Sequence, residues 1–328
     1  MIVVTGGAGF IGSNILAQLS EDGQTGLVVC DWLETDDKWR NIAGCQLEDV
    51  IAPEALFDLL HKNAGQIDAV IHMGAISSTT ETDVDLIVRS NIRLTIDLWD
   101  WCVATGTRLI YASSAATYGD GDTGFDDDMT TSALAQLKPL NAYGWSKHFV
   151  DQRIARHLAQ GGATPPQWSG LKFFNVYGPN EYHKGGQKSV VAHIHPDARG
   201  GGPVKLFKSH NPAYQDGGQL RDFVYVKDCA KVVSWLLDTP SVNGLFNLGT
   251  GEARSFKDLA TAVFAALNRQ PNIEYVDTPE QIRDKYQYFT QARMARLRAA
   301  GYTEDFTSLE DGVADYVRTY LEADDSYR

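Results

Sequence analysis

A tyrosine and a lysine lie four residues apart in the stretch LNAYGWSKHFVDQ, residues 140–152. If this stretch is helical, positions i and i+4 share one face, so the phenol of Tyr143 and the ammonium of Lys147 can occupy one small volume. A phenol titrates near pH 10, and a neighbouring cation favours its ionised form. The pair could therefore transfer protons near neutral pH, although an isolated pair of this spacing is more often a solvated lysine beside a helix end.

The surrounding pattern predicts a helix whose first turn, carrying the pair, is exposed to solvent. Asn141 or Ser146 could cap it, and Pro139 fixes the preceding backbone. Apolar residues then recur at about the helical period, at Phe149, Val150, Ile154 and Leu158.

A second reactive group ends a predicted strand, in the stretch YASSAATYG, where Ser113 and Ser114 reach the carboxyl edge of a sheet. A serine, a tyrosine and a lysine that face a bound nicotinamide can oxidise an alcohol. The phenolate takes the hydroxyl proton, the serine holds the oxygen, and the carbon gives a hydride to the cofactor.

A glycine-rich stretch, TGGAGFIGSN, follows the first predicted strand and leads into a helix that begins at about Phe10. Glycines at positions 6, 9 and 12 let the backbone approach a pyrophosphate, whose charge then lies at the helix N-terminus. Asp31 ends the second predicted strand, where a ribose hydroxyl would bind. The combination predicts a dinucleotide site. Asp31 favours NAD, whereas Lys38 and Arg40 could reach the 2′-phosphate of NADP, so both cofactors stay open.

These motifs require a parallel sheet to hold them, and the first half of the chain alternates strand-length apolar runs with helix-length periodic segments. We predict an α/β fold: a doubly wound (Rossmann) parallel sheet with a smaller α/β C-terminal substrate lobe. The dinucleotide-binding domain would span residues 1–175, with the chain returning to it around 222–250. Residues 176–328 would form mainly the substrate-binding lobe.

Composition excludes several classes of partner. The 328 residues carry a net charge of -13, which argues against nucleic acid and anionic membrane surfaces. The four cysteines are far apart and form no Cys-x-x-Cys pair, so we expect reduced thiols. We see no signal peptide or membrane span, and cytoplasm is the expected compartment. His183, His193 and His195 lack a recognisable ligand set, so we expect no metal.

The order and spacing of TGGAGFIGS, YASSAATYG and YGWSK resemble the extended short-chain dehydrogenase/reductase family. Further stretches are similar to the nucleotide-sugar epimerases of that family that act on ADP-heptose, namely GAISSTTETD, FFNVYGPNEYHKG, RDFVYVKD, FNLGTG and YFTQARMARLRAAGY. The resemblance implies inversion of the C6 carbinol of an ADP-heptose for the lipopolysaccharide inner core. It also implies tightly held NADP and a homo-oligomer, commonly a pentamer.

The same resemblance implies individual contacts. Cofactor contacts would come from Gly6, Gly9, Phe10, Ile11, Gly12, Asp31, Trp32, Lys38, Met73, Gly74, Ala75, Ser77, Asn91, Tyr143, Lys147, Val176 and Lys184. Substrate contacts would come from Ser114, Asn175, His193, Phe207, Lys208, Arg221 and Tyr286. Lys184 would be a second acid/base beside Ser114, Tyr143 and Lys147. Trp32 and Gly186 depart from the family pattern, which usually has a small polar residue and a serine there, and the loop before Arg221 is longer.

Other functions fit the same motifs. A nucleotide-sugar dehydratase or reductase would use the same three reactive groups, but a dehydratase also needs an acid to expel water, and the places after Ser114 hold Ala115 and Ala116. A non-catalytic dinucleotide-binding protein would keep the fold without the chemistry. The presence of all three reactive groups argues against that alternative.

Overall fold

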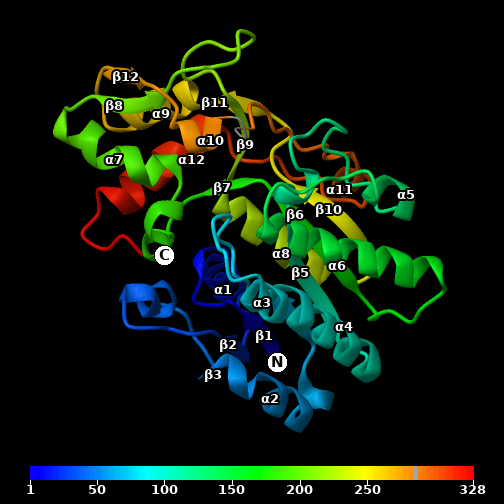
Figure 1. The fold of residues 1–328 in the computed structure, drawn as a ribbon. Coiled ribbons are helices and arrows are strands. Elements are labelled where there is room, and N and C mark those ends of the chain that lie inside the picture. The colour runs from blue at the N-terminus through cyan, green and yellow to red at the C-terminus, as the bar shows by residue number, and fades with distance from the viewer. Residues whose placement is uncertain (284–286) are drawn as a thin grey trace.

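A seven-stranded parallel sheet forms the centre of the larger part of the molecule (Figure 1). The computed structural model describes residues 1–283 and 287–328. The strand order is β10-β6-β5-β4-β1-β2-β3. In chain order the strands are β1 (Ile2–Thr5), β2 (Leu27–Cys30), β3 (Asp49–Ile51), β4 (Ala69–His72), β5 (Arg108–Ser114), β6 (Trp168–Phe173) and β10 (Gly244–Leu248). This is the order of a dinucleotide-binding sheet with a seventh strand added, so the predicted fold class is confirmed.

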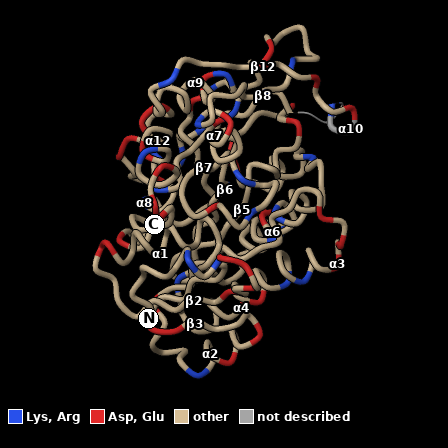
Figure 2. Tube along the Cα trace, turned by 90° about the vertical axis from the view of Figure 1, so that its left-hand side faces the viewer, with Lys and Arg blue, Asp and Glu red and all other residues tan. Residues whose placement is uncertain are grey.

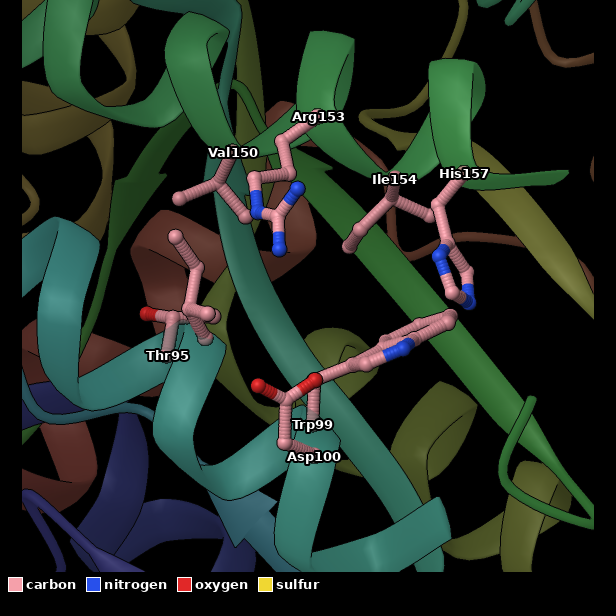
Figure 3. Close-up of a pocket in the computed structure, with 8 residues that line it drawn as sticks. Thr95, Trp99, Asp100, Val150, Arg153, Ile154 and His157 are labelled. Carbon is pink, nitrogen blue, oxygen red and sulfur yellow. The ribbon is translucent and has the colours of Figure 1, made fainter. Parts of the chain in front are cut away.

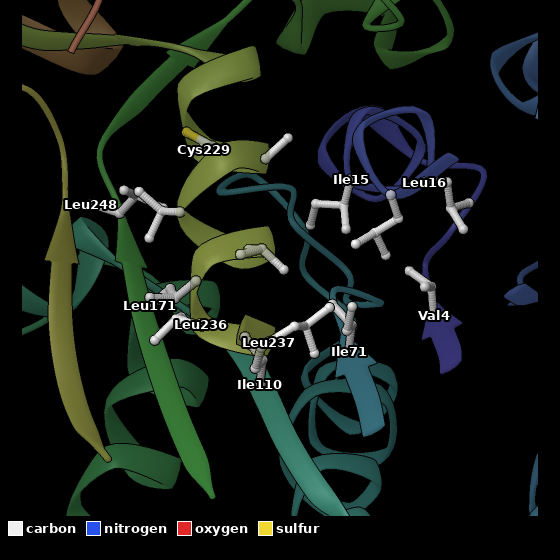
Figure 4. Close-up of a cluster of buried hydrophobic side chains, with 14 of the residues drawn as sticks. Val4, Ile15, Leu16, Ile71, Ile110, Leu171, Cys229, Leu236, Leu237 and Leu248 are labelled. Atoms are coloured by element: carbon white, nitrogen blue, oxygen red, sulfur yellow. The ribbon is translucent and has the colours of Figure 1, made fainter. Parts of the chain in front are cut away.

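Helices cover both faces of this sheet, which explains why β1, β2 and β4 are buried along their whole length. On one face lie α1 (Phe10–Glu21), α8 (Val226–Asp238) and α11 (Ala295–Ala299). Figure 4 shows apolar side chains of α1 and α8 directed at the strands beneath them. On the other face lie α2 (Leu56–Lys62), α4 (Leu94–Thr105) and α6 (Ala142–Ala159). Two short helices, α3 (Val84–Ile87) and α5 (Thr131–Leu134), complete this part.

The sequence pattern does not predict the edge strand β3. It has three residues, Asp49–Ile51, and the first two are exposed. A strand of three residues is too short to show a periodic pattern, so only its pairing with β2 reveals it.

A smaller part of the chain has its own sheets and its own core (Figure 1). Three strands pair in the order β11 (Ala253–Ser255), β9 (Leu220–Tyr225) and β7 (Asn175–Tyr177), and β12 (Ile273–Val276) pairs with β8 (Val204–Phe207). Its helices are α7 (Val190–Gly200), α9 (Phe256–Ala266), α10 (Glu280–Arg283) and α12 (Leu309–Asp315). Because α8 and β10 come after β9, the chain returns to the large sheet before it completes the smaller part.

Charged residues of both signs occur along the whole trace (Figure 2). Asp and Glu outnumber Lys and Arg, 42 to 29. Within residues 1–283 and 287–328, no helix is long and apolar enough to cross a membrane.

Candidate active site

The glycine-rich turn joins β1 to α1 and packs against the end of β4. Gly6 has a positive φ of 64°, and a Cβ there would lie 2.5 Å from the backbone nitrogen of Gly74. A Cβ on Gly12 would collide with the carbonyl of Gly6. Gly9 is the N-cap of α1, and no side chain caps the helix there. The turn therefore leaves the first amides of a 12-residue helix, including those of Phe10 and Ile11, for an anionic ligand.

Asp31 follows β2 and lies beside this turn. Its Oδ2 accepts a hydrogen bond from the backbone nitrogen of Ala8 at 3.0 Å, and its Oδ1 lies 2.9 Å from Nζ of Lys38. The same ammonium donates to the carbonyl of Trp32 at 2.7 Å. The predicted ribose residue and the predicted phosphate cation are thus already in contact. Arg40 points elsewhere, with its guanidinium 4.4 Å from the ring centre of Tyr327.

An open groove lies at the carboxyl ends of β2 and β3, with a volume of about 470 Å³. It is lined by Asp31, Trp32, Leu33, Glu34, Val50, Ile51 and Ala52. The Trp32 side chain is 45% exposed, and its Nε1 donates to Oε1 of Glu54 at 3.0 Å. Trp32, which replaces the family's small polar residue, therefore places a large aromatic surface in the groove.

The loop after β4 is held by one buried amide. Asn91 lies in a π-helical segment, Val88–Arg93, and its side chain accepts from the nitrogen of Ile76 and donates to the carbonyl of the same residue. Its Nδ2 also donates to Oγ of Ser146 at 3.0 Å. Asn91 thereby ties the loop to helix α6. The residues of this loop that the family resemblance singles out are Met73, Gly74 and Ala75, which are half-buried, and Ser77, which is exposed.

Helix α6 begins as the sequence predicts, with the Asn141 side chain accepting from the nitrogen of Gly144 at 2.8 Å. The expectation of an exposed first turn holds only in part. Trp145 is exposed and Tyr143 is half-buried. Lys147 is only 3% exposed, because the helix packs under the end of β5 and the Asn91 segment. The ammonium therefore lies inside the protein, while the tyrosine keeps partial access to solvent.

Burial sets the proton affinity of these groups. It lowers the pKa of Lys147 to about 8, while the negative charge of Asp151 opposes the shift. Burial also raises the pKa of Tyr143, and a hydrogen bond with Ser114 opposes that shift. The hydroxyl of Ser114 accepts from the nitrogen of Ala116 at 3.1 Å. Ser114, Tyr143 and Lys147 are thus brought together at the carboxyl end of β5.

His72 is a buried histidine beside this group, and both of its ring nitrogens have partners. It is fully buried, and its two ring nitrogens lie 2.6 Å from Oγ1 of Thr5 and 2.9 Å from Oγ1 of Thr95. Burial lowers its pKa to about 3, with the charge of Lys147 adding to the effect. A neutral imidazole with both nitrogens occupied holds the β4 end rather than moving protons.

Lys184 reaches the glycine-rich turn from a different part of the chain. It lies in a 3₁₀ segment, Tyr182–Gln187, and its Nζ is 5.0 Å from the ring centre of Phe10. Burial lowers the pKa of Lys184, and the charge of Glu181 opposes the shift. Val176, also a predicted contact, packs half-buried between the two main cores. The structure thus brings Lys184 to the first residue of α1.

Most of the predicted substrate residues lie in the smaller part of the chain. Asn175 is exposed at the start of β7, and its Oδ1 lies 3.5 Å from Oγ1 of Thr290. The Arg221 guanidinium lies 5.6 Å from the ring centre of Phe256 and donates to the carbonyl of Leu220.

Three further predicted substrate residues are Phe207, Lys208 and Tyr286. Phe207 ends β8, and Nζ of Lys208 lies 3.3 Å from Oδ1 of Asp277. Tyr286 lies outside the described residues.

His183, His193 and His195, which are close together in the sequence, each contact a different residue. His193 is exposed on α7, with Nε2 3.3 Å from the carbonyl of Gly186. His183 contacts the amide of Asn41, and His195 lies 2.7 Å from Oε1 of Glu322. The part of the chain that the structure describes holds no group of three His, Cys, Asp or Glu side chains arranged for a metal.

The family model for the NAD dependent epimerase/dehydratase family matches residues 2–249. The chain belongs to this family. A protein of Nitratidesulfovibrio vulgaris strain Hildenborough, named ADP-L-glycero-D-manno-heptose-6-epimerase, is 51% identical over 329 residues, which is 100% of both chains. The crystal structure of Helicobacter pylori ADP-L-glycero-D-manno-heptose-6-epimerase is 28% identical with a TM-score of 0.79, covering 97% of this chain and 95% of the other. The UDP-glucose 4-epimerase of Thermus thermophilus, solved in complex with NAD, is 25% identical with a TM-score of 0.72, covering 97% and 98%.

A small apolar pocket lies away from this epimerase/dehydratase site, between α4 and α6 (Figure 3). Its lining includes Trp99, Ile154 and His157, and its volume is about 20 Å³. That is space for little more than one water molecule, so the pocket is no nucleotide-sugar site.

Sequence reasoning missed the polar residues that support the family's site. Asp151 and Lys172 form a fully buried ion pair behind Ser114. Their signal was available, because a lone lysine in the apolar strand LKFF requires a buried partner, and Asp151 lies one helical turn after Lys147. The amide of Asn41, which donates to the carbonyl of Ala8 in the glycine-rich turn, gives no such signal.

Proposed function

We propose that the protein is an epimerase that inverts the C6 carbinol of an ADP-heptose by transient oxidation with a bound nicotinamide dinucleotide. The observation that carries the proposal is the meeting of Lys184 with Phe10 at the cofactor turn, on a segment separate from Tyr143. Inversion needs proton transfer on both faces of one carbon, and the chain offers one half-buried acid/base group on each of two elements, Tyr143 and Lys184. Full-length relatives that are named ADP-heptose epimerases support the choice of sugar nucleotide.

The residues present fit such a cofactor. Only glycine fits at positions 6 and 12, and the uncapped first turn of α1 can hold a pyrophosphate. Asp31 would hold the ribose, and Asn91 keeps the loop after β4 in place. A bound nicotinamide supplies hydride acceptance and return at the carbinol carbon.

The side chains of the protein would manage the protons. Tyr143, as phenolate, takes the hydroxyl proton of one epimer, while the ammonium of Lys147 stabilises the phenolate and Ser114 holds the oxygen. Lys184 gives or takes the proton for the other epimer. Arg221 and His193 would bind the phosphates and hydroxyls of the substrate.

Incubation with ADP-heptose tests the reaction class. We expect the 6-epimer and no dehydrated keto-deoxy product, because Ala115 and Ala116 leave elimination without its acid. With deuterium at C6, the label should stay on the sugar through many turnovers, as mass spectrometry or NMR can show. Loss of the label to water would replace the redox route by deprotonation at carbon. A dehydrated or reduced product would favour the dehydratase or reductase alternative, and cofactor binding without turnover would favour a binding protein.

NADP is the finer proposal for the cofactor, and it depends on Lys38. Asp31 and Glu34 line the groove and Glu54 contacts its Trp32, so Lys38 must leave Asp31 and turn to the 2′-phosphate. Changing Lys38 to Glu should weaken NADP binding by roughly 10- to 100-fold and leave NAD binding nearly unchanged, since one charge-assisted contact contributes about 1.5–3 kcal/mol. Calorimetric titration of the cofactor-free protein measures both affinities. Equal affinity of the unmodified protein for NAD and NADP would overturn this choice.

The expected homo-oligomer, pentameric by family resemblance, stays a prediction.

A further inference from the structure

A fully buried ion pair lies beneath the candidate catalytic group. Nζ of Lys172 on β6 is 2.9 Å from Oδ2 of Asp151 on α6, and both side chains are 0% exposed. Taking two charges out of water costs several kcal/mol each, and apolar residues of similar volume often serve stability equally well. The presence of the pair directly behind Ser114 therefore calls for a reason beyond stability.

Of the two carboxylate oxygens of Asp151, Lys172 contacts only Oδ2. Oγ of Ser113 donates to the same Oδ2 at 2.8 Å. Oδ1 is buried and has no hydrogen-bond partner within the described part of the chain. The charge of this buried carboxylate acts on the neighbouring groups, because electrostatic interactions are stronger inside a protein than in water.

Lys147 is the neighbour on which this field has a functional effect. It lies four residues before Asp151 on α6, so both side chains share one face of the helix. Burial alone lowers the pKa of Lys147, and Asp151 is the group that opposes the loss of its proton. A charged Lys147 is what stabilises the Tyr143 phenolate.

Lys172 has a second effect, on the position of Ser114. Its Nζ donates to Oγ1 of Thr117 at 2.6 Å, and that hydroxyl donates to the carbonyl of Ser114 at 2.8 Å. The ammonium also lies 4.7 Å from the ring centre of Tyr118. A chain of contacts from β6 thus fixes the turn that follows the β5 end.

The other titratable groups that face the pair stay neutral near pH 7. Burial raises the pKa of Tyr111 on β5 and of Tyr118 in the turn well above the usual value. Burial lowers the pKa of His148 on α6, as it does for His72 on β4. Asp127 and Asp126 also act on Tyr118. Asp151 is the carboxylate that acts on Lys147.

We propose that Asp151 is a positioning residue: it keeps Lys147 in the ammonium form, and with Lys172 and Thr117 it holds Ser114 in register with Tyr143. The proposal rests on the proposed function of the Ser114, Tyr143 and Lys147 group. It assigns to the buried pair a role in proton transfer that packing alone does not require.

The decisive experiment titrates Lys147 directly, in cofactor-free protein labelled with [ε-¹³C]lysine, with its signal assigned by Lys147→Arg. The main variant combines Asp151→Asn with Lys172→Met, so that no unpaired charge stays buried and folding is preserved. We expect the midpoint of Lys147 to move to lower pH by on the order of one unit. The value of kcat at pH 8 should fall by more than roughly five- to tenfold, because fewer molecules carry the ammonium and the contact of Lys172 with Thr117 is lost as well.

Ser113→Ala is the matched control, because it removes a hydrogen bond to the same oxygen and keeps the charge of Asp151. Its Lys147 midpoint should equal that of the unmodified protein. An unchanged midpoint in the double variant would overturn the charge role. The titration of Lys147 needs no turnover. A protein that fails to epimerise ADP-heptose would therefore refute the proposed function and leave the role of Asp151 testable.

A second arm tests the register of Ser114. Thr117→Val breaks the link between Lys172 and the Ser114 carbonyl, and should lower kcat about tenfold with KM and the Lys147 midpoint unchanged. Thr117→Ser keeps the hydroxyl and should restore kcat. Equal kcat in all three proteins would overturn the register role.

Discussion

The two sides of the candidate site are built in opposite ways. Tyr143 and Lys147 lie on α6, one helical turn apart, and Ser114 ends the adjacent β5. Lys184 lies on a short 3₁₀ segment that contains Gly185 at a positive φ of 54°. One side is held by regular elements of the large sheet, and the other depends on contacts from distant parts of the chain.

Those distant contacts are specific. Glu181, fully buried, accepts from Oγ of Ser189 at 2.6 Å and from the hydroxyl of Tyr316 at 3.0 Å. The hydroxyl of Tyr182 donates to the carbonyl of Ser326 at 2.7 Å. The Lys184 segment is therefore positioned by the start of α7, by the π-helical segment Tyr316–Leu321 that follows α12, and by the C-terminal residues.

The largest expected effects come from removing the acid/base group on either side. Tyr143→Phe and Lys184→Met should each slow epimerisation by about 10²- to 10⁴-fold, because each removes proton transfer for one epimer. Substrate and cofactor should still bind. Turnover measured by NMR of the two epimers, with affinities from calorimetry, checks both variants.

Trp145→Phe is the control on the Tyr143 side, since Trp145 is exposed between the two reactive residues of α6. Lys188→Met controls for charge on the Lys184 side. If Lys184→Met epimerised at nearly the normal rate, Tyr143 would be the sole acid/base, with a ketone that turns over in the pocket.

The pH dependence separates a two-sided site from a one-sided one. Burial raises the pKa of Tyr143 and lowers that of Lys184. Tyr143 and Lys184 must start each turnover in opposite protonation states, so kcat should be bell-shaped, changing about tenfold per pH unit on each limb. Loss of the Lys147 proton also lowers kcat at alkaline pH, because the pKa of Lys147 is about 8. The test is therefore the residual rate of Lys184→Met, whose alkaline limb should come from Lys147 alone and be less steep. Identical pH profiles of Lys184→Met and the unmodified protein would contradict the two-sided site.

The Tyr143 side was predictable because its information is local. Asn141 as cap, the spacing of Tyr143 and Lys147, and the serine at the strand end all follow from short patterns. The prediction of an exposed first turn was wrong for Lys147, since the packing of α6 under β5 buries it. Local patterns give element type and spacing, whereas burial is decided by what packs on top.

The Lys184 side was not predictable from periodicity. A lysine in the Gly-rich stretch HKGGQ has the pattern of a solvated loop, and family resemblance alone singled it out. Two of the contacts that hold the segment join residues more than 130 positions apart, Glu181 with Tyr316 and Tyr182 with Ser326. No short sequence window contains both partners of either contact.

The smallest expected effect concerns the C-terminal residues that hold the Lys184 segment. The ring of Tyr327 contacts the ring of Tyr182 edge-on at 5.3 Å and lies under the guanidinium of Arg40. Nearby, the Arg328 side chain reaches Oε2 of Glu21 on α1 at 2.7 Å, which anchors the chain end to the cofactor helix. Tyr327 thus links the segment that carries Lys184 to the segment that carries Lys38.

Tyr327→Ala removes both ring contacts of that link, which together contribute about 1–2.5 kcal/mol. Only part of this free energy acts on Lys184, so kcat should fall by roughly two- to tenfold. In [ε-¹³C]lysine spectra the Lys184 signal should shift while that of Lys147 stays fixed, because the Tyr143 side is held by other elements. Asp324→Ala, an exposed position in the same tail, is the matched control. A lower melting temperature with unchanged kcat and an unchanged Lys184 signal would show that the tail stabilises the fold without positioning the second base.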